Sequence, residues 1–174
     1  MRSDARRYCL RDQYKRPLFP GYLIAVCSTT HRFHRRATLD IEELADEPLL
    51  LLQRTFASRE WLDIACQVAH IQPRVHLESA APHTIIALAR AGHGMAIVPS
   101  SVTVPSRNVW AAPLTQHGTP LGRWLTVAWD THRFMAPYAE QLVEELVHHC
   151  EHRHPGREFI ERAPGLPHPF AATG

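Results

Sequence analysis

The sequence predicts an α/β domain built on a mostly parallel sheet, and three observations lead to this fold class. Short apolar runs alternate with amphipathic segments between residues 49 and 98, in the order strand, helix, strand, helix, strand. Glycines at 92 and 94 predict a sharp turn before the last of these strands. The segment between the last two strands is long enough for the crossover that a parallel pair requires.

A strand and a short helix precede this unit. Residues 22–27 (YLIAVC) form the continuous apolar run typical of a buried strand. Asp40 and Glu43 have the spacing of a capping box, so we expect a helix that begins after Asp40 and ends before Pro48.

The unit itself has five predicted elements. In chain order they are a strand at 49–52, a helix at 59–70, a strand at 74–78, a helix at 83–91 and a strand at 95–98. Ser58 is predicted to cap the first helix, because its hydroxyl can accept a hydrogen bond from the first turn. Gly92 can adopt the left-handed conformation that ends the second helix.

Two strands and a helix follow, at 109–114, at 124–129 and from Pro137 onward. Apolar side chains recur along this last helix at helical spacing, which predicts that it packs on a core. They are Met135, Ala139, Leu142 and Leu146. Residues 151–174 are rich in proline and glycine, so we expect a mobile tail.

Composition is that of a globular protein able to bury a core. The 174 residues are 45% hydrophobic and 21% charged, and the net charge of +2 is too small to indicate nucleic-acid binding. No apolar run approaches the ~18 residues of a membrane span, and the first residues lack the apolar stretch of a signal peptide. Four dispersed cysteines are expected to be reduced thiols, so a cytoplasmic protein is expected.

Two clusters of polar side chains leave alternatives open. Arg32, Arg35 and Arg36 are interpreted as a solvated face, with specific phosphate binding as the alternative. Histidines gather around Cys150, at positions 148, 149, 152 and 154. We interpret them as a frayed helix end, with a zinc or nickel site as the alternative. No metal, cofactor or catalytic residue is expected, because none of the common catalytic or nucleotide-binding motifs is present.

The order of these elements resembles the effector-binding domain of LysR-type transcriptional regulators, from about residue 17 to residue 150. The segments that carry the resemblance are LIAVCSTTHRF, LDIEELADEPLLLL, SREWLDIA, LARAGHGMAIVP and WLTVAW. The resemblance implies a periplasmic-binding-protein-like domain with two α/β lobes and a small effector between them. The resemblance rests on the order and spacing of all these segments together, since no single motif is diagnostic.

The resemblance also implies how the chain is divided. Residues 38–99 correspond to one nearly complete lobe, while 17–37 and 100–150 correspond to an N-terminally truncated second lobe. The irregular segment 1–16 is too short for the family's winged helix-turn-helix, so we expect contact with DNA only through a missing domain or a partner.

The candidate ligand site lies beyond the strands that end near residues 52 and 78. Ligands in open α/β sheets bind outside the carboxyl ends of the strands, and helix N-termini there attract anions. The side chains expected to contact an organic anion are Gln53, Arg54, Thr55, Ser58, Ser79 and His83. Each has a purely structural alternative, such as helix capping by Ser58 or exposure to solvent for Arg54 and His83.

Two functions are therefore expected to compete. The first is a small-molecule effector-sensing domain of a LysR-type regulator, forming a homodimer. The second is a truncated or vestigial fragment that acts only in oligomerisation or protein interaction. It predicts oligomers or aggregates, because the missing half-lobe would leave strands 22–27 and 124–129 with an uncovered flank.

Overall fold

The computed structural model describes residues 13–130, 132–154, 156–163 and 165–166. The chain divides into two compact units. The sheet unit contains residues 20–123 and 155–174, and the strand–helix unit contains residues 1–19 and 124–154.

The sheet of the structure contains both parallel and antiparallel strand pairs. Its strands are β1 (Gln13–Ser28), β2 (Leu39–Asp40), β3 (Pro48–Leu52), β4 (Arg74–Ser79), β5 (Met95–Pro99), β6 (Val109–Gln116), β7 (Thr119–Pro120) and β8 (Gly122–Asp130). The order is β2-β6-β1-β5-β3-β4, with β7 beside β6 and β8 beside β1. Strand β3 pairs in parallel with β4 and β5, as predicted, whereas β1 is antiparallel to β5 and β6.

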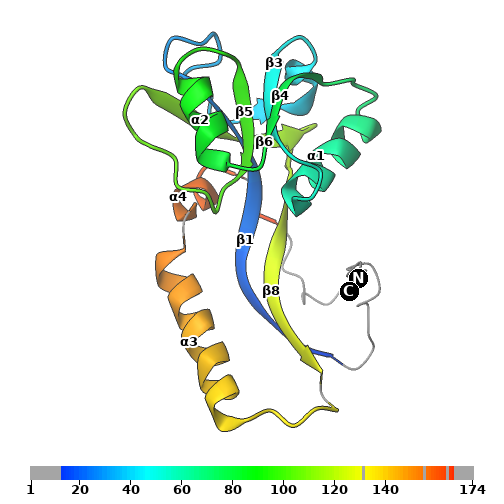
Figure 1. Ribbon diagram of the computed structural model, residues 1–174, viewed down its shortest axis with the longest axis vertical. Coiled ribbons are helices and arrows are strands. Elements are labelled where there is room, and N and C mark those ends of the chain that lie inside the picture. The colour runs from blue at the N-terminus through cyan, green and yellow to red at the C-terminus, as the bar shows by residue number, and fades with distance from the viewer. Residues whose placement is uncertain (1–12, 131, 155, 164, 167–174) are drawn as a thin grey trace. The chain divides into compact units, whose positions relative to one another are not determined.

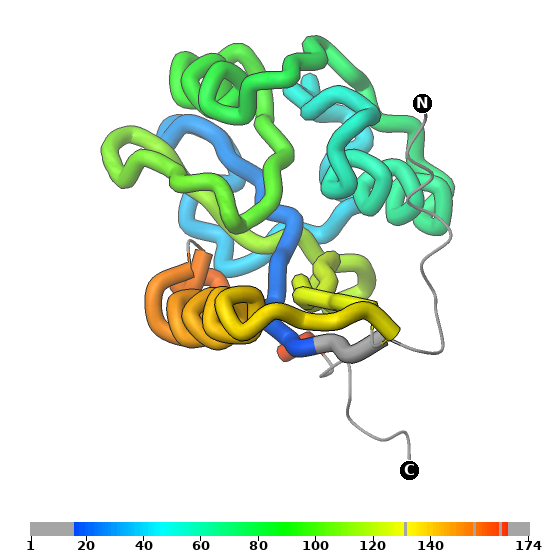
Figure 2. The backbone as a smooth tube through the Cα atoms, turned by 60° about the horizontal axis from the view of Figure 1, so that its bottom comes forward, coloured from blue at the N-terminus to red at the C-terminus, as the bar shows by residue number. Residues whose placement is uncertain are grey.

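Two helices cover opposite faces of this sheet. Helix α1 (Ala57–Val68) follows β3, and α2 (Pro82–Arg90) follows β4. Figure 1 shows them on either side of β3, β4 and β5, and they remain on separate sides in Figure 2. This is the arrangement that alternating strands and helices predict, since each crossover packs one helix on the sheet.

The apolar run of residues 22–27 is explained by burial on both faces. Leu23 and Ala25 of β1 belong to the core under α1, while Ile24 and Val26 belong to the core under α2. Because successive side chains of a strand point to opposite faces, a strand covered on both sides needs apolar residues throughout. The expected uncovered flank at residues 22–27 is therefore wrong, since β1 lies between β5 and β6.

The same pairing differs from the expected division into lobes. Residues 38–99 were expected to form a lobe apart from 17–37 and 100–150. In the structure β1 and β6 pair with each other, and β1 also pairs with β5. One sheet therefore contains strands from both expected lobes. The antiparallel strands β1 and β6 extend the parallel group of β3, β4 and β5.

The predicted tail also contributes to this core. Residues 157–160 form a short helix, α4 (Arg157–Ile160), and Phe159 and Ala163 are buried beside α2. This part differs from the mobile tail expected over residues 151–174, because its apolar side chains Phe159 and Ala163 pack against the sheet unit. Residues 167–174 lie outside the described part of the chain.

The strand–helix unit contains the start of β1, most of β8 and helix α3 (Pro137–Arg153). The start of α3 at Pro137 is confirmed. Arg16 of β1 donates to Glu144 of α3 at 2.7 Å, and Phe19 stacks on His154 with ring centroids 4.6 Å apart. None of the helices in the described residues is long and apolar enough to cross a membrane.

The predicted buried face of α3 is wrong. Leu142 is 67% exposed and Leu146 is also exposed, whereas the buried residues of the helix are Val147 and Cys150. Helical spacing identifies an apolar face, but it does not show whether anything in this chain covers that face.

Candidate functional site

The candidate site lies where β3, β4 and β5 end. These strands are parallel, so their carboxyl ends meet at one edge of the sheet, with Leu52 opposite Ser79. The backbone N–H of Gln53 donates to the carbonyl of Ser79 at 3.2 Å, which joins the two loops at their first residues. The loops that precede α1 and α2 therefore begin side by side.

Both helices present open N-termini at this edge. Helix α1 begins after Phe56 and α2 begins after Ala81, and neither residue supplies a side-chain cap. The first N–H groups of a helix have no partner within the helix and carry a partial positive charge. In α2 one such donor is missing because Pro82 occupies the first turn. The arrangement suits an anionic group better than a cationic one.

The structure brings most of the predicted side chains to this edge. Gln53, Arg54 and Thr55 are exposed in the loop after β3, and His83 is exposed in the first turn of α2. Ser79 is half-buried, and its Oγ accepts a hydrogen bond from the N–H of Ala81 at 3.1 Å. The hydroxyl of Ser79 therefore shapes the loop, as its structural alternative predicts.

Ser58 does not cap α1. The helix begins at Ala57, so Ser58 lies within its first turn and is buried. The prediction is wrong because the turn after β3 is completed by the N–H of Phe56, which donates to the carbonyl of Gln53. This turn starts the helix two residues earlier than a serine cap would.

Arg59 is the charged residue of this edge that the sequence analysis missed. Its side chain is buried, and its guanidinium donates to Glu78 at 2.6 Å, to Asp63 at 2.8 Å and to the carbonyl of Leu52 at 2.9 Å. Burial opposes the charge, but these two carboxylates outweigh it and raise the pKa of Arg59. The i, i+4 spacing of Arg59 and Asp63 was the available signal in the sequence.

Ser100 is a second residue that was missed. It follows β5, is only 1% exposed, and its Oγ accepts from the N–H of Tyr22 at 3.1 Å. The N–H of Ser100 donates in turn to the carbonyl of Tyr22 at 2.8 Å. This reciprocal pair joins the end of β5 to β1.

A separate hollow of about 170 Å³ lies along α1 and is lined by Trp61, Ala65, Leu121 and Arg123, among others. The guanidinium of Arg123 lies 5.7 Å from the ring centroid of Trp61. None of the six predicted side chains lines this hollow.

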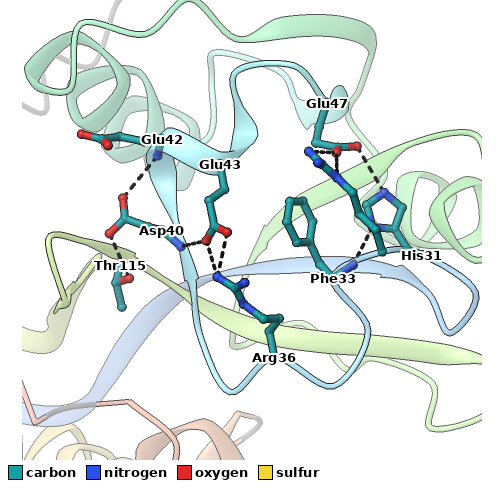
Figure 3. Close-up of polar contacts among 9 residues, drawn as sticks. His31, Phe33, Arg36, Asp40, Glu42, Glu43, Glu47 and Thr115 are labelled. Atoms are coloured by element: carbon teal, nitrogen blue, oxygen red, sulfur yellow. Dashed lines mark hydrogen bonds and ion pairs between the residues drawn. The ribbon is translucent and has the colours of Figure 1, made fainter.

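The basic loop after β1 lies at the opposite edge, because β1 runs antiparallel to β5. Figure 3 shows how its charges are paired. Arg32 lies 2.6 Å from Glu47, and Arg36 lies 2.7 Å from Glu43. Both guanidinium groups also lie over the ring of Phe33. Arg32 and Arg36 thus hold the loop against the segment 43–47, which favours a structural role over phosphate binding for these two residues.

The capping box beside this loop is confirmed. Asp40 accepts from the N–H of Glu42, and Glu43 accepts from the N–H of Asp40, at the start of a 3₁₀ helix, η2 (Ile41–Leu44). Figure 3 shows that the carboxylate of Glu43 also accepts a hydrogen bond from Arg36. The same carboxylate therefore contacts both the helix start and the basic loop.

The described cysteines are unsuited to act as nucleophiles. Burial, with a contribution from the charge of Glu47, raises the pKa of Cys27 to about 12. Burial, together with the charge of Asp63, raises the pKa of Cys66 to about 11. Burial also raises the pKa of Cys150. The thiolate is the reactive form, so these thiols are inert near neutral pH.

We expect the described thiols to react slowly with an aromatic disulfide reagent at pH 8. A thiol with a pKa near 11 is only about one part in a thousand ionised there, against about a quarter for an ordinary thiol. In a Cys9→Ser/Cys150→Ser variant, which retains Cys27 and Cys66, labelling in native buffer should be at least about 100-fold slower than in denaturant. A fast phase of labelling in native buffer would contradict the raised pKa values.

Because the folded pKa values of these thiols are raised, the free energy of unfolding should fall as pH rises above about 9.

Comparison with known proteins gives a consistent family. The family model described as LysR substrate binding domain matches residues 10–151. The uncharacterized HTH-type transcriptional regulator YybE of Bacillus subtilis (strain 168) is 25% identical over 132 residues, which are 76% of this chain and 44% of that protein. The chain thus spans less than half the length of this relative.

Solved structures share the fold at low sequence identity. The effector binding domain of QuiR in complex with shikimate gives a TM-score of 0.65 at 17% identity, covering 82% of this chain and 68% of that chain. The regulatory domain of Synechocystis PCC6803 CcmR in complex with 2-PG gives 0.69 at 16%, covering 82% and 69%. The fold is therefore the α/β, periplasmic-binding-protein-like fold of LysR effector domains, and this chain belongs to the LysR substrate-binding domain family.

Proposed function

We propose that this chain senses a small organic anion, and that the anion binds at the carboxyl edge of β3, β4 and β5. The observation that carries the proposal is the pair of uncapped helix N-termini behind two loops that share a hydrogen bond. An anion at such a terminus gains about 0.3–1 kcal/mol, and up to ~2 kcal/mol where it is partly buried.

The proposed ligand contacts are the side chains of the two loops and the helix starts. They are Gln53, Arg54, Thr55, Ser58, Ser79 and His83. Arg54 offers a planar pair of donors for a carboxylate, and His83 lies beside the first N–H groups of α2. Ser58, being buried in the first turn of α1, would contribute its backbone N–H more readily than its hydroxyl.

The wider role proposed is that of the effector domain of a transcriptional regulator. The curated relative is named as a transcriptional regulator, and two structural neighbours are described in complex with small molecules. On this proposal the chain has no catalytic residue, acts in the cytoplasm as a homodimer, and reaches DNA through another domain or a partner.

We expect a matching carboxylate to raise the melting temperature. A panel of small carboxylates that includes shikimate is screened by thermal denaturation. At a concentration 100-fold above Kd, binding adds about 2.7 kcal/mol, or roughly 5–10 °C in a domain of this size. Ser79→Ala and His83→Ala should reduce the shift, while Ser106→Ala, in an exposed loop after β5, should not.

The competing function is an interaction module without a ligand. Its support is the exposed apolar side chains of the strand–helix unit, Phe134, Tyr138, Leu142 and Leu146. A broad panel that gives no stabilisation, together with a protein that self-associates, would favour this function over effector binding.

A further inference from the structure

Helix α3 carries a group of metal-binding side chains near its end. His148, Glu151 and His152 each offer a ligand atom, and these atoms lie within 4.8 Å of one another. Sequence reasoning interpreted these histidines as a frayed helix end. The structure instead continues α3 to Arg153, so the spacing i, i+3, i+4 places the three side chains on one face of a formed helix.

The orientation of His152 suits a metal ligand. Its Nδ1 lies 2.8 Å from the carbonyl oxygen of His148. A carbonyl oxygen can only accept a hydrogen bond, so Nδ1 carries a hydrogen, and in the neutral ring the atom that can bind a metal is then Nε2. Histidines that bind metals are commonly held in this way by a backbone carbonyl. The rings of His148 and His152 lie 4.5 Å apart between centroids, so the two imidazoles are in contact on one face of α3.

The surface beside these rings has room for an ion and its water. A hollow of about 240 Å³ is lined by Glu145, His148, His149, His152 and Arg153. Glu145 and Arg153 place one carboxylate and one guanidinium in this lining, and Glu151 adds a second carboxylate close to His148 and His152.

We propose that His148, Glu151 and His152 bind one divalent transition-metal ion, for which Zn²⁺ is the best match. Two imidazoles and one carboxylate are a known zinc donor set, and they leave a fourth position for water or an incoming ligand. Mg²⁺ and Ca²⁺ prefer oxygen ligands only. Tetrahedral bonds of about 2.0–2.1 Å place ligand atoms about 3.3 Å apart. The side chains are exposed, so small rotations about their χ angles can close the remaining distance.

The test is a calorimetric titration of ZnCl₂ into the 174-residue chain, without a tag, after dialysis against a chelator. We expect one ion per chain and an affinity that falls about tenfold or more in His148→Gln and in His152→Gln. Glu151→Gln should weaken binding less, because the charge is lost while an oxygen ligand remains. The matched control is His76→Gln, which removes an exposed histidine of β4, outside the strand–helix unit.

Three results would overturn the proposal. The first is the absence of saturable binding up to about 1 mM Zn²⁺. The second is a loss in His76→Gln equal to that in His152→Gln. The third is full affinity in the double variant of His148 and His152, since the ion would then be held elsewhere. Far-UV circular dichroism of every variant checks that α3 remains folded, so that a loss of affinity reports on the ligands.

Discussion

Replacing Gly94 by alanine should lower the free energy of unfolding by about 3–5 kcal/mol, the range that marks a severe single substitution. Gly94 has φ +146°, a conformation that residues with a side chain rarely adopt. A Cβ at this position would also clash with the carbonyl oxygen of Pro48 and lie 3.2 Å from its carbonyl carbon. Both atoms belong to backbone at the start of β3, which cannot move without disturbing its pairing with β5.

Gly92 provides the matched control for this prediction. It has φ +88°, but a Cβ there would have no neighbour within 4 Å. Gly92→Ala should therefore cost only the strain of the left-handed conformation, about 1–2 kcal/mol. Urea denaturation followed by far-UV circular dichroism measures both variants. Equal losses would show that the approach to Pro48 is not the cause.

These two glycines show how far the sequence leads. The segment Gly92-His93-Gly94 predicts a sharp turn between a helix and a buried strand, and both elements are present as α2 and β5. The sequence does not reveal which residue lies against Gly94 in the fold. Pro48 lies 46 positions earlier in the chain, and only the pairing of β5 with β3 brings it to Gly94.

The candidate site was predictable to a similar extent. Strand ends and helix starts follow from local patterns, so the segments 53–58 and 79–84 could be expected at one edge, where the structure has them. The contacts that organise this edge depend on partners in other elements. Arg59 pairs with Glu78 of β4, and Ser100 pairs with Tyr22 of β1, neither of which a local pattern reveals.

Helix α3 shows the opposite error, in which a clear sequence pattern predicted burial that the structure does not have. Its apolar positions have helical spacing, and a helix did form. Burial, however, is a property of the surroundings rather than of the helix. Leu142 remains exposed, while the shorter side chain of Cys150, two turns further along, is buried. Hydrophobic periodicity therefore predicted the element correctly and its environment wrongly.

Arg59 organises the candidate site through three acceptors at once. Its guanidinium joins the end of β3, through the carbonyl of Leu52, to Glu78 near the end of β4. Asp63, on the next turn of α1, accepts a further hydrogen bond from the guanidinium of Arg59. The loops that carry the proposed ligand contacts leave β3 and β4 directly after these points, so their positions depend on the same side chain.

Substituting Arg59 by leucine should therefore lower the free energy of unfolding by about 2–3 kcal/mol. Removing one partner of a buried ion pair costs about 3–5 kcal/mol, and the partial hydration of Glu78 and Asp63 reduces this value. Urea denaturation measures the loss. The control is Arg54→Leu, an exposed arginine in the preceding loop, which should change stability by no more than about 0.5 kcal/mol. If the two leucine variants were equally stable, Arg59 would not be what joins β3 to β4.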